Sequence, residues 1–131
     1  MTPQSVTFEL SLTDLIDHKQ RIVSDLVGLY TPHPLQYEYD EEDKEAHVLV
    51  RFSEESVHLT RRGQATTHLD FNPHHPTTFS IDDHNLRLEG VCETLKLIKL
   101  KQYLFIHYRL SKEGQVVAEQ EMELKVKVSE A

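Results

Sequence analysis

Polar and apolar side chains alternate along most of this chain, and the pattern is clearest near its C-terminal end. Residues 121–128 read Glu-Met-Glu-Leu-Lys-Val-Lys-Val. A period of two indicates a β-strand with one apolar face and one solvated face. Residues 5–13 alternate in the same way and place four apolar residues on one face: Val6, Phe8, Leu10 and Leu12.

The rest of the chain divides into short apolar runs separated by turn signals. The runs that predict strands are 21–29, 35–39, 48–52, 57–61, 65–69, 79–81, 86–97, 104–110 and 116–128. Proline, glycine, asparagine and aspartate mark most of the turns between them. Short strands at regular spacing, without a convincing helix, are typical of an antiparallel sandwich or barrel. Closure removes exposed strand edges, so we predict an all-β fold, a closed, mostly antiparallel β-barrel of eight to ten strands.

Two strands carry details that affect which side chains point inward. The apolar positions of the run 86–97 change parity near Gly90, which predicts a β-bulge there. In the last strand we expect Val116 and Ala118 to face inward together with Met122 and Leu124.

Composition narrows the functional classes. At 131 residues we expect one domain, residues 1–131, with one core. The formal net charge of −8 argues against nucleic acid and against anionic membrane surfaces as partners. The single cysteine excludes an internal disulfide, and the N-terminal residues show no cationic start and no apolar stretch. We therefore expect a cytoplasmic protein.

No recognised catalytic motif is present, so the sequence favours a non-enzymatic role without a cofactor. Imidazole and carboxylate groups in the loops, at His74, His75, His84 and the neighbouring Asp82 and Asp83, are the residue types that bind zinc or nickel. Their irregular spacing favours exposed loop histidines instead.

Cys92 is the one candidate nucleophile, with His107 as the nearest candidate base along the chain. Because a lone cysteine usually packs as a small apolar side chain, we expect Cys92 to be buried and inert.

A short basic stretch, Lys96, Lys99 and Lys101, could form one patch with Arg61 and Arg62. Barrels that bind single-stranded nucleic acid combine such a patch with aromatic platforms. Few aromatic residues lie nearby and tryptophan is absent, so a solvated strand or corner is the favoured interpretation.

Three stretches together resemble the YwiB-like family of small bacterial proteins, a domain-of-unknown-function family. They are residues 37–42, residues 57–63 and residues 104–110, and the most specific is the Val-x-Leu-x-Arg-x-Gly pattern that ends at Gly63. The resemblance extends over residues 6–128. It implies a calycin-like or lipocalin-like closed β-barrel in a bacterial protein, and it implies no activity.

Two functions are compatible with these observations. One is binding of a small, partly apolar molecule in or at the mouth of the barrel, with Tyr37, Tyr39, Arg61 and Tyr108 as the candidate ligand-binding residues. The bulky inward rows favour a packed core over a large cavity. The alternative is therefore a protein-interaction or regulatory module with a filled barrel and no ligand, which pairs with a partner protein or with a second copy of the chain.

Overall fold

The computed structural model describes residues 3–41 and 45–128, so residues 42–44, in the acidic loop 40–45, lie outside the described residues. The described chain forms ten strands: β1 Gln4–Asp14, β2 Lys19–Pro32, β3 Leu35–Asp40, β4 His47–Phe52, β5 Val57–Arg62, β6 Thr66–Phe71, β7 Thr77–Asp83, β8 Leu86–Leu100, β9 Tyr103–Lys112 and β10 Gln115–Val128.

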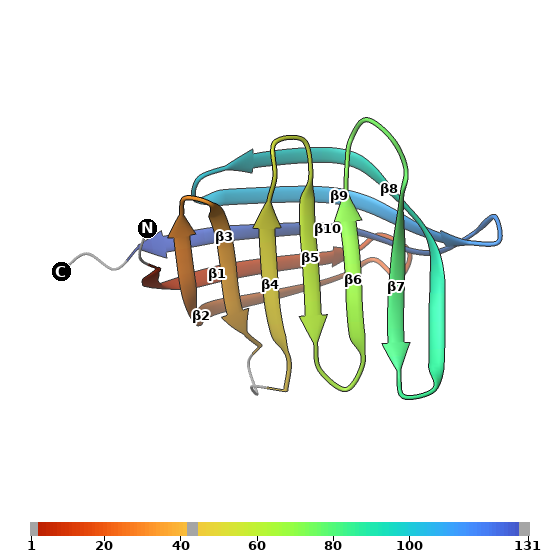
Figure 1. Ribbon diagram of the computed structural model, residues 1–131, viewed down its shortest axis with the longest axis horizontal. Helices are drawn as coiled ribbons and strands as arrows, with labels where there is room; N and C mark the ends of the chain where they lie inside the picture. The colour runs from red at the N-terminus through yellow and green to blue at the C-terminus, as the bar shows by residue number, and fades with distance from the viewer. Residues whose placement is uncertain (1–2, 42–44, 129–131) are drawn as a thin grey trace.

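The strands form a closed antiparallel barrel in which each pairs with its neighbours along the chain and β10 returns to pair with β1 (Figure 1). The predicted all-β closed barrel is thereby confirmed. Closure satisfies the backbone donors and acceptors that a flat sheet would leave at its edges. Within the described ranges, no helix has both the length and the apolar character to span a membrane.

The barrel is flattened into two layers whose strands cross steeply. In Figure 1, β3–β7 run across β1, β9 and β10, while the long strands β2 and β8 bend and take part in both layers. Each bend coincides with a local irregularity. Asp25 in β2 has a φ of 61°, and the pairing of β1 with β2 shifts between Phe8 and Leu10. The pairing of β8 with β9 shifts between Thr94 and Lys96. Strands that change layer at bulges make the corners of orthogonal barrels.

The bulge in β8 therefore lies at Leu95, not near Gly90 as the sequence pattern suggested. Gly90 has a different role, because a Cβ there would lie 2.2 Å from the Ser111 carbonyl oxygen and 2.5 Å from Phe79 Cε1. The misplaced bulge also misplaced side chains, since Val91 is 43% exposed and lies on the outer face. A second bulge between Val116 and Ala118 likewise leaves Val116 48% exposed.

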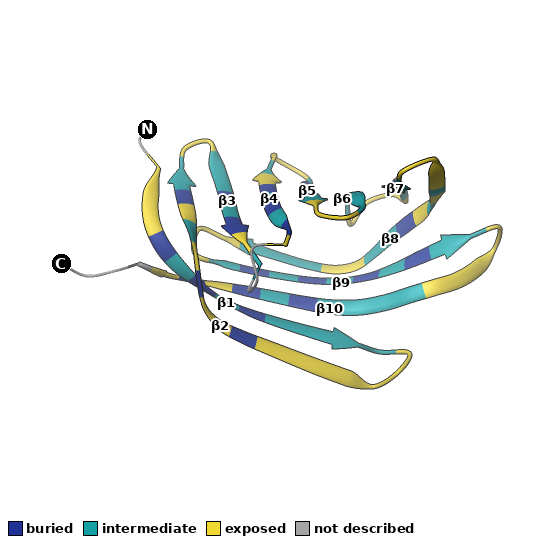
Figure 2. Cartoon of the chain, turned by 90° about the horizontal axis from the view of Figure 1, so that it is seen from below, coloured by how far each residue is buried: buried dark blue, intermediate teal, exposed yellow. Residues whose placement is uncertain are grey.

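The alternating apolar rows meet inside the barrel, as the banded burial along β1, β9 and β10 shows in Figure 2. One half of the interior is filled by aromatic rings, and the Phe8 and Phe52 rings lie 5.6 Å and 4.7 Å from that of Tyr37. The Tyr37 hydroxyl donates to the carbonyl oxygens of Leu100 and Lys101 at 3.2 and 2.9 Å. This packed half fixes β3 against the turn between β8 and β9.

Candidate functional site

The interior of the barrel is not filled throughout. A hollow of about 290 Å³, here called the cup, opens at the end where β1, β3, β5 and β9 finish. Its walls are inward-facing side chains from both layers: Leu10, Leu12, Arg21, Tyr39, Glu41, Val48, Leu59, Arg61, Thr67, Leu69, Tyr108, Leu110, Gln120 and Met122.

The cup exists because the inward rows change character along their length. In β1 the fully buried Phe8 is followed by the leucines at 10 and 12, and in β5 Leu59 is followed by the polar Arg61. At this end most inward side chains are aliphatic, with only the rings of Tyr39 and Tyr108 among them, and they leave a hollow between the two layers. Met122 is 4% exposed and belongs to both regions, because it packs in the core and also lines the cup.

An ion pair stands at the rim of the cup. The Arg61 Nε and Nη2 atoms donate to the two carboxylate oxygens of Glu41 at 2.7 and 3.0 Å, a bidentate geometry. These hydrogen bonds hold the pKa of Glu41 below its ordinary value, and the positive charge of Arg21 acts in the same direction. The rim therefore carries two guanidinium groups and one ionised carboxylate.

Two tyrosines bring hydroxyl groups to the apolar wall. The Tyr108 hydroxyl donates to Gln120 Oε1 at 2.7 Å. Tyr39 is only 3% exposed, and among the described residues its hydroxyl has no hydrogen-bond partner. Burial raises the pKa of both phenols, so both stay protonated near neutral pH.

Three of the four candidate residues thus come together. Tyr39, Arg61 and Tyr108 line the cup from β3, β5 and β9, whereas the Tyr37 ring lies in the packed half and its hydroxyl bonds to backbone. The sequence pattern missed Arg21, Glu41 and Gln120. Arg21 and Gln120 have the parity of inward positions near strand ends, and that parity is the signal which could have identified them.

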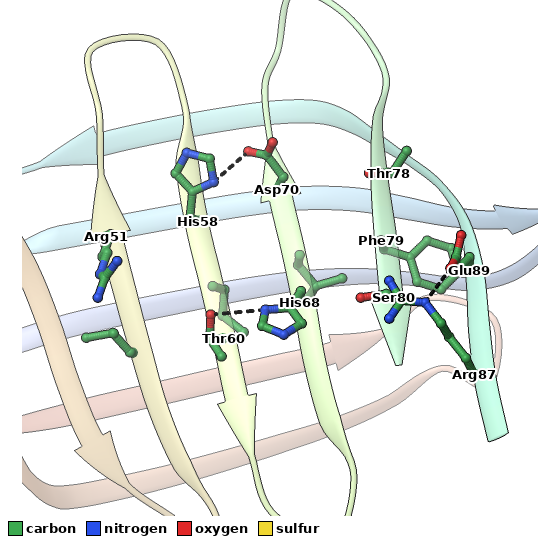
Figure 3. A pocket seen from close by; sticks show the side chains of 13 residues that line it. Arg51, His58, Thr60, His68, Asp70, Thr78, Phe79, Ser80, Arg87 and Glu89 are labelled. Carbon is green, nitrogen blue, oxygen red and sulfur yellow. Dashed lines mark hydrogen bonds and ion pairs between the residues drawn. The ribbon is translucent and has the colours of Figure 1, made fainter. Parts of the chain in front are cut away.

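A second, larger hollow of about 560 Å³ lies on the outside of the barrel, across β4–β8 (Figure 3). Its side chains are mostly polar. His58 Nδ1 lies 3.1 Å from Asp70 Oδ1, and Thr60 Oγ1 lies 3.4 Å from His68 Nδ1. Because this hollow is lined mostly by polar side chains while the cup is lined mostly by apolar ones with a few polar groups, the cup is the better candidate for a partly apolar ligand.

The other candidate groups of the sequence do not assemble. Cys92 is fully buried inside the barrel, while His107 is on the outer face, where its Nε2 lies 2.9 Å from Glu119 Oε2. Burial raises the pKa of the Cys92 thiol to about 11, which leaves it protonated and unreactive.

The loop histidines are also apart, because residues 74 and 75 precede β7 and residue 84 follows it, at opposite ends of that strand. Throughout the described ranges, no three His, Cys, Asp or Glu side chains are placed to share a metal ion. The structure does not assemble the basic patch, which was the less favoured interpretation of the sequence: Arg61 points into the cup, and Lys99 Nζ donates to backbone carbonyls of the turn after β4.

Comparison with known proteins agrees with this architecture. A family model described as "Domain of unknown function (DUF1934)" matches residues 14–124. Among solved structures, the chain is similar to the ywiB protein from Bacillus subtilis, with a TM-score of 0.74 and 15% sequence identity. The alignment covers 98% of this chain and 94% of that chain. At such low identity the likeness shows the fold alone. No curated protein matches the chain.

Proposed function

We propose that this chain, which belongs to the DUF1934 family of domains of unknown function, binds a small, partly apolar molecule in the cup. The observation that carries the proposal is the Tyr39 hydroxyl, which lines the cup from a residue 3% exposed and has no partner in the described chain. The hydroxyl oxygen stays accessible from the hollow, because it is not one of the fully buried polar atoms that lack a partner, and it can therefore donate to an acceptor inside the cup.

The volume of the cup limits the ligand to a small molecule. At about 290 Å³ it lies at the lower end of ligand pockets. A water molecule takes about 30 Å³ in the liquid, so the cup holds on the order of ten non-hydrogen atoms. A long lipid chain does not fit this volume, and a single ring or a short branched chain does.

The polar groups indicate how such a ligand is oriented. Its apolar body packs against the leucines and Met122, and an acceptor group receives the Tyr39 hydroxyl proton. Arg61, held by Glu41 at the rim, offers a further donor toward the solvent side. In this arrangement the barrel acts as a calycin-like cup that is closed at one end by the aromatic half.

The proposal includes a bacterial, cytoplasmic protein. The fold match to a Bacillus subtilis protein supports a bacterial origin. A single buried cysteine supports a reducing compartment, where disulfides are rare.

The first experiment is native mass spectrometry of gently purified protein, which detects a ligand that stays bound. The second is an NMR titration with p-cresol and toluene, two probes that differ by one hydroxyl group. We expect saturable amide shifts around the cup from both probes. A clean apo mass together with no saturable shift from either probe would contradict the proposal.

A pair of tyrosine variants tests the orientation of the ligand. Tyr39→Phe is expected to weaken p-cresol binding by about 2–10-fold, the usual value of one hydrogen bond, and to leave toluene binding unchanged. Tyr30→Phe is the matched control, because Tyr30 is equally buried but does not line the cup. Equal effects of the two variants on p-cresol would show that Tyr39 does not contact the probe.

The alternative, a protein-interaction module, is favoured by one observation. The outer face of β2 exposes Ile22 and Val27 to 60% and 72%. Side chains of this kind are common at interfaces. Light scattering and affinity capture, each with the parent chain and with Val27→Lys, test this alternative. It requires a complex, either of two copies of the chain or with another protein, and Val27→Lys must weaken that complex. If both forms are monomeric and capture no protein, the interaction module is excluded and ligand binding in the cup remains.

A further inference from the structure

The outer hollow is built into the sheet by the register of its strands. On the outer face of β4–β7 one row consists of Leu49, Thr60, His68 and Ser80, which are paired in turn. Short side chains in this row are flanked by long ones, so the face is concave (Figure 3). An adjoining hollow of about 390 Å³ shares four of its residues and extends it toward β3. We call the two together the outer groove.

Ser80 shows that the outer groove is a shaped site and not only a rough surface. Although its side chain points outward, Ser80 is only 9% exposed. No residue of the described chain forms a hydrogen bond with it, and Figure 3 shows its hydroxyl directed into the groove. Its hydroxyl oxygen is not one of the fully buried unpaired atoms, so it is open to the groove and can pair with a group that binds there.

Among the described residues, the outer groove contains as many arginines as carboxylates, and the carboxylates of Asp70 and Glu89 are paired with His58 and Arg87. Arg51 and Arg62 flank the Leu49–Thr60 pair on its two sides, and both line the same hollow. Across residues 3–41 and 45–128, neither arginine has a carboxylate partner. The nearest carboxylate in that hollow, Glu38, is already bonded to His47 Nε2 at 2.8 Å. Two unpaired guanidinium groups on a chain of net charge −8 make a local positive site.

We propose that the outer groove binds a small molecule that carries an oxyanion and neighbouring hydroxyl groups. The oxyanion lies between Arg51 and Arg62, because guanidinium groups bind carboxylate and phosphate with two parallel hydrogen bonds. The hydroxyl groups of the ligand reach His68 and Ser80 along the floor. A phosphate ester and a hydroxy acid share this chemistry. The site is independent of the cup, which lies on the other side of the sheet.

The experiment is an NMR titration of the ¹⁵N-labelled chain at constant ionic strength. Glucose 6-phosphate and gluconate are the two probes, with glucose and inorganic phosphate as partial ligands. We expect one or both probes to shift the amides of Thr60, His68 and Ser80 in a saturable way, and more tightly than either partial ligand does. The tighter of the two probes identifies the oxyanion as phosphate or carboxylate.

Charge-matched variants separate a specific site from general attraction. Arg51→Gln/Arg62→Gln is expected to weaken the tighter probe by about tenfold or more, the usual loss of two charge-assisted hydrogen bonds. Lys101→Gln/Lys112→Gln changes the net charge by the same two units away from the groove, and its effect should stay below about threefold. All four side chains are at the surface and make no ion pair in the described chain, so both double variants should fold.

Ser80→Ala tests the floor of the groove. We expect it to weaken the tighter probe by about 2–10-fold and to leave inorganic phosphate unchanged, because only the hydroxyl groups of the probe reach Ser80. Glucose binding as tight as that of its phosphate ester, or equal losses in the two double variants, would overturn the proposal.

Discussion

The sharpest prediction compares one chemical change at two buried tyrosines. Replacing Tyr37 or Tyr39 by phenylalanine removes a single hydroxyl and keeps the ring. Both residues are almost fully buried, at 0% and 3% exposed, and both rings pack on Phe8 at 5.6 and 5.4 Å. Area burial alone therefore predicts the same effect on the free energy of unfolding. The hydrogen bonds predict effects of different size.

At Tyr37 the hydroxyl donates to two backbone carbonyls, of Leu100 and Lys101. Its loss is expected to lower the free energy of unfolding by about 1–2 kcal/mol. At Tyr39 the hydroxyl has no partner in the described chain and faces the cup, so its removal breaks no hydrogen bond within the protein. We expect Tyr39→Phe to change the free energy of unfolding by less than about 1 kcal/mol.

The assay is urea denaturation followed by circular dichroism, with equal slopes of free energy against urea required for a valid comparison. Tyr108→Phe provides an intermediate reference, because Tyr108 has one side-chain partner, Gln120. The expected order of stability is Tyr39→Phe first, Tyr108→Phe second and Tyr37→Phe last. A loss of about 1 kcal/mol or more in the free energy of unfolding of Tyr39→Phe is the usual value of one hydrogen bond. Such a loss would show that the Tyr39 hydroxyl has a partner inside the protein, and the argument for the cup would fail.

Three further predictions address the backbone, the thiol and the outer ion pairs. Gly28→Ala should destabilise the fold by about 3 kcal/mol or more, since its Cβ would lie 2.1 Å from the Glu38 carbonyl oxygen; a thermal midpoint close to that of the parent would refute the close approach. Cys92 should react with a thiol reagent only in denaturant, because burial raises its pKa to about 11; rapid labelling of native protein at pH 8 would contradict this. His47 forms hydrogen bonds with Asp40 and Glu38, and these raise the pKa of its imidazole above the ordinary value. The contribution of the protonated imidazole to stability is therefore full below about pH 6.5, and it is lost as the pH rises through the pKa of the folded state. The histidine is half-exposed, so His47→Gln should lower the free energy of unfolding by less than about 1 kcal/mol at pH 5.5, and by a smaller amount at pH 8.5. An equal loss at the two pH values would show that protonation of His47 does not contribute to stability.

The sequence predicted the barrel well because a period of two is a local signal. The row Leu104, Ile106, Tyr108 and Leu110 faces inward throughout, as its spacing requires. The prediction was wrong where a bulge shifts the parity, as at Val116, because a bulge is placed by pairing with another strand. A single strand carries little information about where its partner bends.

The candidate site was predictable only in part for the same reason. Tyrosines at inward positions pointed to the cup. Tyr37 and Tyr39 have the same parity, however, and only the packing shows that the Tyr37 ring fills the core while Tyr39 lines the wall of the cup. The outer groove was missed entirely. Its residues alternate with core positions and therefore look like an ordinary solvated face, and only the register of β4 with β5 places Arg51 and Arg62 on the two sides of the Leu49–Thr60 pair.

The division of the barrel into a packed half and an open half has a consequence for how the protein can change. The aromatic half, with Tyr37 tied to the β8–β9 turn, contributes rigidity that does not depend on what surrounds the cup. Leu12 is the cup leucine best suited to substitution, because it is only partly buried, whereas Leu10, Leu59, Leu69 and Leu110 belong to the core. A barrel of this kind is suited to redesign for new small molecules, with the residues of one end exchanged and those of the other end kept.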